Sequence, residues 1–155
     1  MAAMKEAITF RPYSSLDRPC CLDMFDANCP QFFAPNERED YATFLDSVVS
    51  QYQVCAIADR LVGAFGLIGQ FSDVGALNWI LLDPGVQGSG IGSLIMDRVV
   101  VLSQRSAYRR VNIAASHKSA PFFKKFGAQV IKTTPDGWGP GMHRVDMVLR
   151  MRGDA

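Results

Sequence analysis

A glycine-rich segment, residues 87–92 (Gln-Gly-Ser-Gly-Ile-Gly), separates two runs of different periodicity. The run before it, residues 76–82, is short and apolar, which is typical of a buried strand. The run that starts at Ile91 repeats apolar residues at helical spacing. Glycines let the backbone curl until several N–H groups point at one spot, and a helix dipole adds partial positive charge there. The junction therefore predicts a site for an anion such as a pyrophosphate.

Three kinds of glycine loop compete for this segment, and neighbouring residues distinguish them. A P-loop needs lysine and then serine or threonine after its last glycine, whereas Ile91 follows Gly90 here. A dinucleotide-binding loop needs a third small residue, which Ser93 only approximates. It also needs an acidic residue about 20 positions onward, and residues 110–112 contain none. The pattern that remains is Gln-x-x-Gly-x-Gly after a strand and a proline-containing turn.

Composition limits the classes of protein to consider. At 155 residues, about half of them apolar, the chain suits one domain with its own hydrophobic core. The 16 basic and 15 acidic residues leave a net charge of +1 without long runs of one sign, so we expect no binding to nucleic acid or to a membrane surface. No 18 consecutive apolar residues occur. We expect a soluble, cytoplasmic protein.

The cysteines are Cys20, Cys21, Cys29 and Cys55, and their spacing is not that of metal ligands. Cys55 lies inside an apolar run, where a thiol behaves as a small hydrophobe. We expect reduced cysteines and no metal.

Periodicity and turn residues predict the order of the elements. The expected strands cover residues 7–11, 54–58, 61–68, 76–82, 111–115, 128–133 and 144–151. The expected helices cover residues 14–28, 36–49, 91–106 and 120–125. The apolar side of the second helix would carry Phe44, Leu45, Val48 and Val49. Antiparallel hairpins are thus combined with a crossover at the glycine loop.

Two segments carry more specific patterns. Residues 81–92 are Leu-Leu-Asp-Pro-Gly-Val-Gln-Gly-Ser-Gly-Ile-Gly, and residues 116–128 are Ser-His-Lys-Ser-Ala-Pro-Phe-Phe-Lys-Lys-Phe-Gly-Ala. The first resembles the acyl-CoA pyrophosphate loop of the GCN5-related N-acetyltransferase (GNAT) superfamily, and the second resembles its Asn-x-x-Ala-x-x-Phe-Tyr-x-x-x-Gly-Phe segment. The resemblance implies a single domain over residues 1–155 with the α/β (α+β) acyl-CoA N-acyltransferase fold. In that fold about four helices flank a twisted, mixed, mostly antiparallel sheet of about seven strands.

The resemblance also implies a reaction, in which acetyl-CoA is the cosubstrate and its acetyl group passes directly to a primary amine of a small molecule or peptide. The fourth and fifth strands splay apart in this family, and backbone groups there hold the pantetheine arm and the acyl carbonyl. The implied cofactor-binding residues are Leu81, Leu82, Gln87, Gly88, Ser89, Gly90, Ile91, Gly92, Ser116 and Phe123.

Two positions depart from the family pattern. Phe123 stands where a tyrosine commonly protonates the leaving thiolate, and Ser116 stands where the family has asparagine. Because Phe123 has no proton to give, the proton would come from water or another side chain, or catalysis would be weaker. The base is also open: Asn78, on the fourth strand, could orient a water but not accept a proton at neutral pH. His117 and His143 are the histidines, and His143 is the better candidate because the connection between the last two strands often borders the acceptor site in this family.

The glycines and prolines of residues 135–143 predict a shaped, mobile loop at this place. Trp138 either covers the acceptor or anchors the loop on the core. Asp136 could attract a cationic amine. Phe32 and Phe33 present the same choice between acceptor contact and core packing, with core packing favoured.

Two classes of function remain open. The first is an acetyl-CoA-dependent N-acetyltransferase. The alternative is a non-catalytic acyl-CoA-binding sensor or regulatory module on the same fold, which the missing tyrosine favours. In either case a homodimer is a possible assembly.

Overall fold

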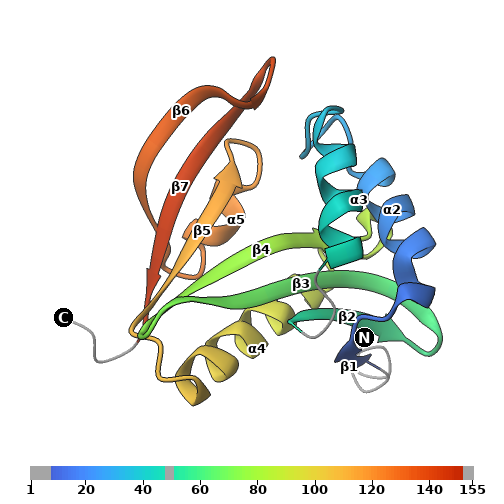
Figure 1. The fold of residues 1–155 in the computed structure, drawn as a ribbon, viewed down its shortest axis with the longest axis horizontal. Helices are drawn as coiled ribbons and strands as arrows, with labels where there is room; N and C mark the ends of the chain where they lie inside the picture. The colour runs from blue at the N-terminus through green and yellow to red at the C-terminus, as the bar shows by residue number, and fades with distance from the viewer. Residues whose placement is uncertain (1–7, 48–50, 152–155) are drawn as a thin grey trace.

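The computed structural model describes residues 8–47 and 51–151, and these residues form a seven-stranded sheet flanked by helices (Figure 1). In the order in which they pair, the strands are β1 (Ile8–Pro12), β2 (Tyr52–Ile57), β3 (Arg60–Phe71), β4 (Val74–Leu82), β5 (Arg110–Ser116), β7 (Met142–Arg150) and β6 (Gln129–Gly139). Within this sheet β4 and β5 pair in parallel, and the other neighbours are antiparallel. The expected mixed, mostly antiparallel sheet of seven strands is confirmed, and the sheet is open.

Four α-helices and two short 3-10 helices occur in the described ranges. They are η1 (Ser15–Asp17), α2 (Arg18–Ala27), α3 (Glu37–Ser47), η2 (Pro84–Val86), α4 (Ile91–Arg105) and α5 (Ala120–Lys124). All four predicted helices are present. Ala7, predicted in the first strand, and Val48 and Val49, predicted in the second helix, lie outside the described residues. No helix in the described ranges is long and apolar enough to cross a membrane.

The pleat of the central strands divides the apolar residues between two cores. On β2, Val54 belongs to the buried cluster that contains residues of α2 and α3. The next residue, Cys55, is a free thiol in the cluster that contains residues of α4 and α5. Successive side chains of a strand point to opposite faces, so α2 and α3 cover one face of the sheet and α4 the other (Figure 1). The loop after β4 therefore extends from a strand that is supported on both faces.

The hairpin of β6 and β7 corrects one prediction. In place of a mobile loop over residues 135–143, β6 continues to Gly139 and β7 begins at Met142, with a tight turn between them. The glycine-rich composition was misleading because Gly137 is needed where β7 approaches β6 closely. A Cβ added to Gly137 would collide with the Cβ of Arg144 on β7. Glycine in a strand often marks a place where neighbouring groups approach closely. The register with β7 shifts between Thr134 and Gly139, so residues 135–138 form a bulge within this hairpin.

Candidate active site

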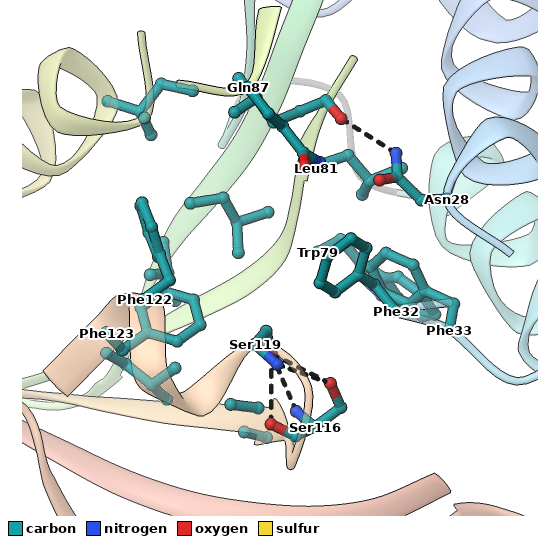
Figure 2. A pocket seen from close by; sticks show the side chains of 18 of the residues that line it. Asn28, Phe32, Phe33, Trp79, Leu81, Gln87, Ser116, Ser119, Phe122 and Phe123 are labelled. Carbon is teal, nitrogen blue, oxygen red and sulfur yellow. Dashed lines mark hydrogen bonds between the residues drawn. The ribbon is translucent and has the colours of Figure 1, made fainter. Parts of the chain in front are cut away.

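A cavity opens where β4 and β5 stop pairing. The two strands pair from Val74 with Arg110 to Leu77 with Ile113, and beyond that point they diverge (Figure 1). Between them lies a cavity of about 620 Å³ (Figure 2). Its walls come from β4, β5, the glycine loop, the start of α4, α5, the segment between α2 and α3, and Trp138. The splayed strands expected from the family resemblance are thus present.

Most of the predicted site residues line this cavity. Those that do are Asn78, Leu81, Leu82, Gln87, Gly88, Gly90, Gly92, Ser116, Phe123 and Trp138. Those outside its lining are Ser89, Ile91, Asp136 and His143. Ile91 is 1% exposed and packs in the apolar core under α4. Any contact that Ile91 makes with an anion would therefore come from its backbone.

The glycine loop has the backbone geometry that the sequence predicts. Gly88 (φ 83°) and Gly90 (φ 93°) are both left-handed, a conformation that costs other residues about 1 kcal/mol or more. Gly90 is the N-cap of α4 and has no side chain to satisfy the N–H groups of the first turn. A Cβ added to Gly92 would lie 2.8 Å from Cε1 of Phe122, so this glycine lets α5 pack closely against the start of α4. The free amides at this helix start suit an anion.

A bulge in β4 sets the backbone beside the cavity. Trp79 has a φ of 48°, and the register against β3 shifts between Ala64 and Gly66. The hydroxyl of Tyr52 donates a hydrogen bond to the carbonyl of Trp79, and the hydroxyl of Tyr41 lies 2.9 Å from that of Tyr52. Burial raises the pKa of both tyrosines, so both remain protonated. The two tyrosines therefore hold the bulge in place.

Asn28, which the sequence did not single out, connects α2 to the end of β4. It is 3% exposed, and its Nδ2 donates to the carbonyl of Met24 at 2.8 Å. The same Nδ2 donates to the carbonyl of Leu82 at 2.9 Å, the bond drawn in Figure 2. The Leu82 carbonyl therefore has a donor within the chain, and its direction is set by α2. The residue pattern around Asn28 indicates only the end of a helix, which is why this role could not be predicted.

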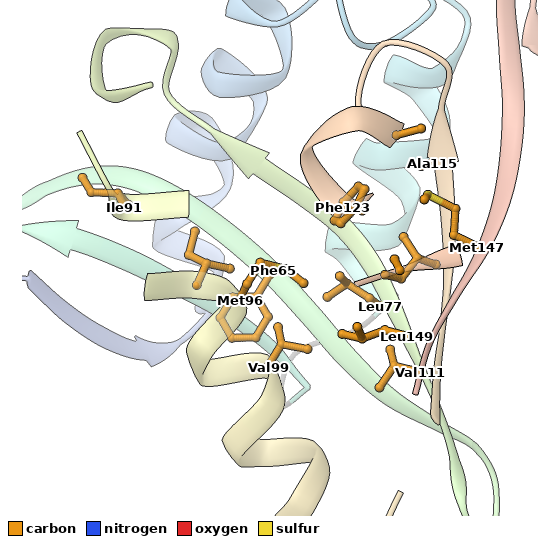
Figure 3. Close-up of a cluster of buried hydrophobic side chains, with 14 of the residues drawn as sticks. Phe65, Leu77, Ile91, Met96, Val99, Val111, Ala115, Phe123, Met147 and Leu149 are labelled. Atoms are coloured by element: carbon orange, nitrogen blue, oxygen red, sulfur yellow. The ribbon is translucent and has the colours of Figure 1, made fainter. Parts of the chain in front are cut away.

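Ser116 and Phe123 occupy the two positions that depart from the family pattern. The Oγ of Ser116 accepts from the backbone N–H of Ser119 at 3.1 Å and lies 3.1 Å from the Oγ of Ser119 (Figure 2). These bonds fix the turn before α5. Phe123 is 2% exposed and packs in the core near Leu77 and Met147 (Figure 3). It borders the cavity from this buried position without offering a proton.

The two histidines lie together outside the cavity lining. The ring centroids of His117 and His143 are 4.6 Å apart. The Nδ1 of His117 accepts from the His143 backbone N–H at 3.1 Å, and the Nδ1 of His143 accepts from the Asp136 backbone N–H at 3.0 Å. The Oδ1 of Asp136 accepts from the N–H of Gly141 at 2.7 Å. All three side chains thus stabilise the tip of the β6–β7 hairpin, and a role in the reaction stays a prediction.

Trp138 links this hairpin to the opposite wall of the cavity. Its Nε1 donates to the carbonyl of Ala115 on β5 at 2.9 Å, and its own carbonyl accepts from Nδ2 of Asn36 at 2.8 Å. The guanidinium of Arg144 lies 4.9 Å from the centre of its ring. The indole therefore borders the cavity and anchors the hairpin, and its contact with an acceptor stays a prediction.

Charge is distributed unevenly over the lining. Glu37 is its only carboxylate and Lys125 its only cation among the described residues. Glu37 is 5% exposed, and its Oε2 accepts from the backbone N–H of Ala34 at 2.8 Å. Burial raises the pKa of Glu37 to about 7. The sequence signalled only a glutamate in the first turn of a helix, so its position at the cavity was missed.

No three potential metal ligands gather within residues 8–47 and 51–151.

An open sheet whose central parallel strands separate beside a glycine loop defines the class of acyl-CoA N-acyltransferase folds. The family model for the acetyltransferase (GNAT) family matches residues 21–128. The chain therefore belongs to the GNAT family, whose members are acyltransferases. Among curated proteins, none is similar enough in sequence to match.

Solved structures show the same fold at low sequence identity. Ard1 from Thermoplasma volcanium is 16% identical with a TM-score of 0.76, over 94% of this chain and 98% of that one. A GCN5-related N-acetyltransferase from Kribbella flavida is 17% identical with a TM-score of 0.74, over 95% and 99%. Rv2747 from Mycobacterium tuberculosis, solved in complex with CoA and NLQ, is 19% identical with a TM-score of 0.69, over 92% and 99%. At these identities the likeness shows the fold alone.

Proposed function

We propose that this protein transfers the acetyl group of acetyl-CoA to a primary amine of a small molecule or peptide. The observation that carries the proposal is the cavity between the diverging ends of β4 and β5. It extends from the free amides of the glycine loop to the aromatic side chains between α2 and α3. A cosubstrate with a pyrophosphate at one end and a thioester at the other suits a cavity of this form.

Each part of the lining has a role in this proposal. The N–H groups of Gln87 and Ser89 bond to carbonyls within the loop, so the amides of Gly88 and of residues 90–92 bind the pyrophosphate. Lys125 adds positive charge to the lining. The pantetheine arm lies along the unpaired edge of β4, beside the backbone of Leu81 and Leu82. The β4 bulge at Trp79 turns the backbone there, so that an amide is available for the thioester oxygen as negative charge develops on it.

The chemistry has to proceed without a tyrosine at position 123. The amine nitrogen, once neutral, attacks the thioester carbon; a C–N bond forms and the C–S bond breaks. The nitrogen gives up one proton, and the leaving thiolate takes up one proton. With phenylalanine at the family's tyrosine position, water in the cavity carries these protons, and Asn78 in its lining orients such a water. His143 remains a weaker candidate for the base.

The test is to incubate the purified protein with acetyl-CoA and a panel of amines and to identify the products by mass spectrometry. Product detection is preferable to a thiol reagent because Cys20 is an exposed free thiol. N-acetylated product that depends on the protein supports the proposal. Acetyl-CoA binding without any such product would favour the alternative, a non-catalytic acyl-CoA sensor, which the buried Phe123 supports.

A further inference from the structure

We propose that Glu37 receives the positive charge of the acceptor, and that the acceptor is an amine carried on an aromatic or other apolar group. The inference rests on the proposed function, because it assigns the acceptor to the end of the cavity opposite the glycine loop. It adds a specificity-determining residue on α3 and a chemical class of acceptor.

Three aromatic side chains of the lining gather around this end. Phe32, Phe33 and Trp79 lie together on one side of the cavity, while Phe122 and Phe123 face them from the other (Figure 2). The rings of Phe33 and Trp79 are stacked with centroids 6.1 Å apart. Aromatic rings in such a wall bury the surface of an apolar group, and their faces attract a nearby ammonium.

Glu37 supplies the charge that an amine needs. It lines the cavity together with these rings and is the only acid that does so among the described residues. Lys125, the cation of the lining, comes from the segment after α5. The titratable groups that interact with Glu37 are Asp40 on α3 and the Cys29 thiol after α2, and neither is a cation. The next residue in the chain, Arg38, is paired with Asp26. The negative charge of Glu37 therefore lacks a partner within the described chain.

The local structure does not require that charge. One oxygen of Glu37 accepts the N–H of Ala34, which completes the reciprocal bonds at the start of α3, where the Glu37 N–H bonds to the Ala34 carbonyl at 2.9 Å. A glutamine at this helix position makes the same bond. The described chain gives this carboxylate no further hydrogen bond. A buried carboxylate is costly unless a cation or further donors approach it, and an ammonium in the cavity meets that need.

The test compares Glu37→Gln with Glu39→Gln. Glutamine preserves the bond to Ala34 and removes the charge, and Glu39 is an exposed acid in the same first turn of α3. The probes are 2-phenylethylamine, its neutral counterpart 2-phenylethanol, and ethylamine, which lacks the ring. Binding to each CoA-saturated protein is measured by calorimetry, and CoA affinity and circular dichroism establish that each variant is folded.

We expect the wild-type protein to bind 2-phenylethylamine about tenfold or more tightly than 2-phenylethanol, since a buried charge-assisted bond is worth at least that factor. It should also bind 2-phenylethylamine more tightly than ethylamine, because the phenyl ring buries additional apolar surface. Glu37→Gln should abolish the preference for the amine over the alcohol, and Glu39→Gln should keep it within about twofold. Retention of the preference in folded Glu37→Gln, or its absence in the wild type, would overturn the assignment of Glu37. Equal affinities for ethylamine and 2-phenylethylamine would overturn the inference that the acceptor carries an apolar group.

Product analysis separates this inference from the proposed function. An amine preference that depends on Glu37, without any N-acetylated product, would refute acetyl transfer and support charge recognition by Glu37. Acetylation of 2-phenylethylamine at an equal rate by the wild type and Glu37→Gln would refute the role of Glu37 and support acetyl transfer.

Discussion

Replacing Glu37 by glutamine should make the protein more stable at alkaline pH. Burial raises the pKa of this carboxyl from 4.5 to about 7, so between these two pH values the folded protein holds a proton that the unfolded chain has released. Stability conferred by the protonated side chain is therefore lost as the pH rises through this window. Glutamine keeps the bond to Ala34 and carries no titratable group, so Glu37→Gln avoids the loss.

The magnitude follows from the difference between the two pKa values. One pH unit corresponds to about 1.4 kcal/mol, which gives a full effect of about 3 kcal/mol over the window. Between pH 5.5 and pH 8.5 the stability of Glu37→Gln relative to the wild type should rise by about 2 kcal/mol. For a domain of this size that change corresponds to about 4–8 °C in Tm.

Urea unfolding followed by circular dichroism at both pH values measures this difference, with Glu39→Gln as the control. Glu39 is exposed, so its replacement should shift the free energy of unfolding by no more than about 0.5 kcal/mol at either pH. A Glu37→Gln protein whose stability relative to the wild type is the same at pH 5.5 and pH 8.5 would refute the reasoning. So would a variant that becomes relatively less stable at the higher pH.

Three further predictions address the cavity. Gly90→Val should weaken CoA binding by about tenfold or more by obstructing the backbone's approach to phosphate, whereas Gly127→Val, at a similarly left-handed glycine outside the cavity lining, should leave CoA affinity unchanged in calorimetry. Unchanged affinity in folded Gly90→Val would contradict the loop assignment. Phe123→Tyr should maintain or increase turnover, because the ring is preserved and a proton donor is added; loss of nearly all turnover in a folded variant would count against this account. Trp138→Ala should raise the KM of the acceptor, and His143→Ala should lower kcat and flatten its pH profile between about 6 and 8 if His143 is the base. If both variants lose only thermal stability, their bonds at the hairpin are structural.

Local patterns in the sequence were sufficient for most of the fold. The helical and strand periodicities placed every α-helix and strand of the described ranges near its observed position. The exception was the end of β6, where a local rule failed for a specific reason. Gly137 lies in a segment rich in glycine and proline, a composition that indicates a turn. The close approach of Arg144 is the reason that glycine is required there. A composition rule does not distinguish these two uses of glycine.

The sequence by itself determined the strand, glycine loop and helix over residues 76–105, because backbone curvature and periodicity depend on residues that are near one another in the chain. Only the tertiary structure decided the opposite wall of the cavity. Asn28 meets the Leu82 carbonyl across 54 positions, and Asn36 meets the Trp138 carbonyl across 102. Glu37 reads in the sequence as a residue of a helix start, and it becomes a buried charge beside aromatic rings only when α3 packs over the end of β4. Such pairings depend on the packing of whole elements, which no local pattern specifies.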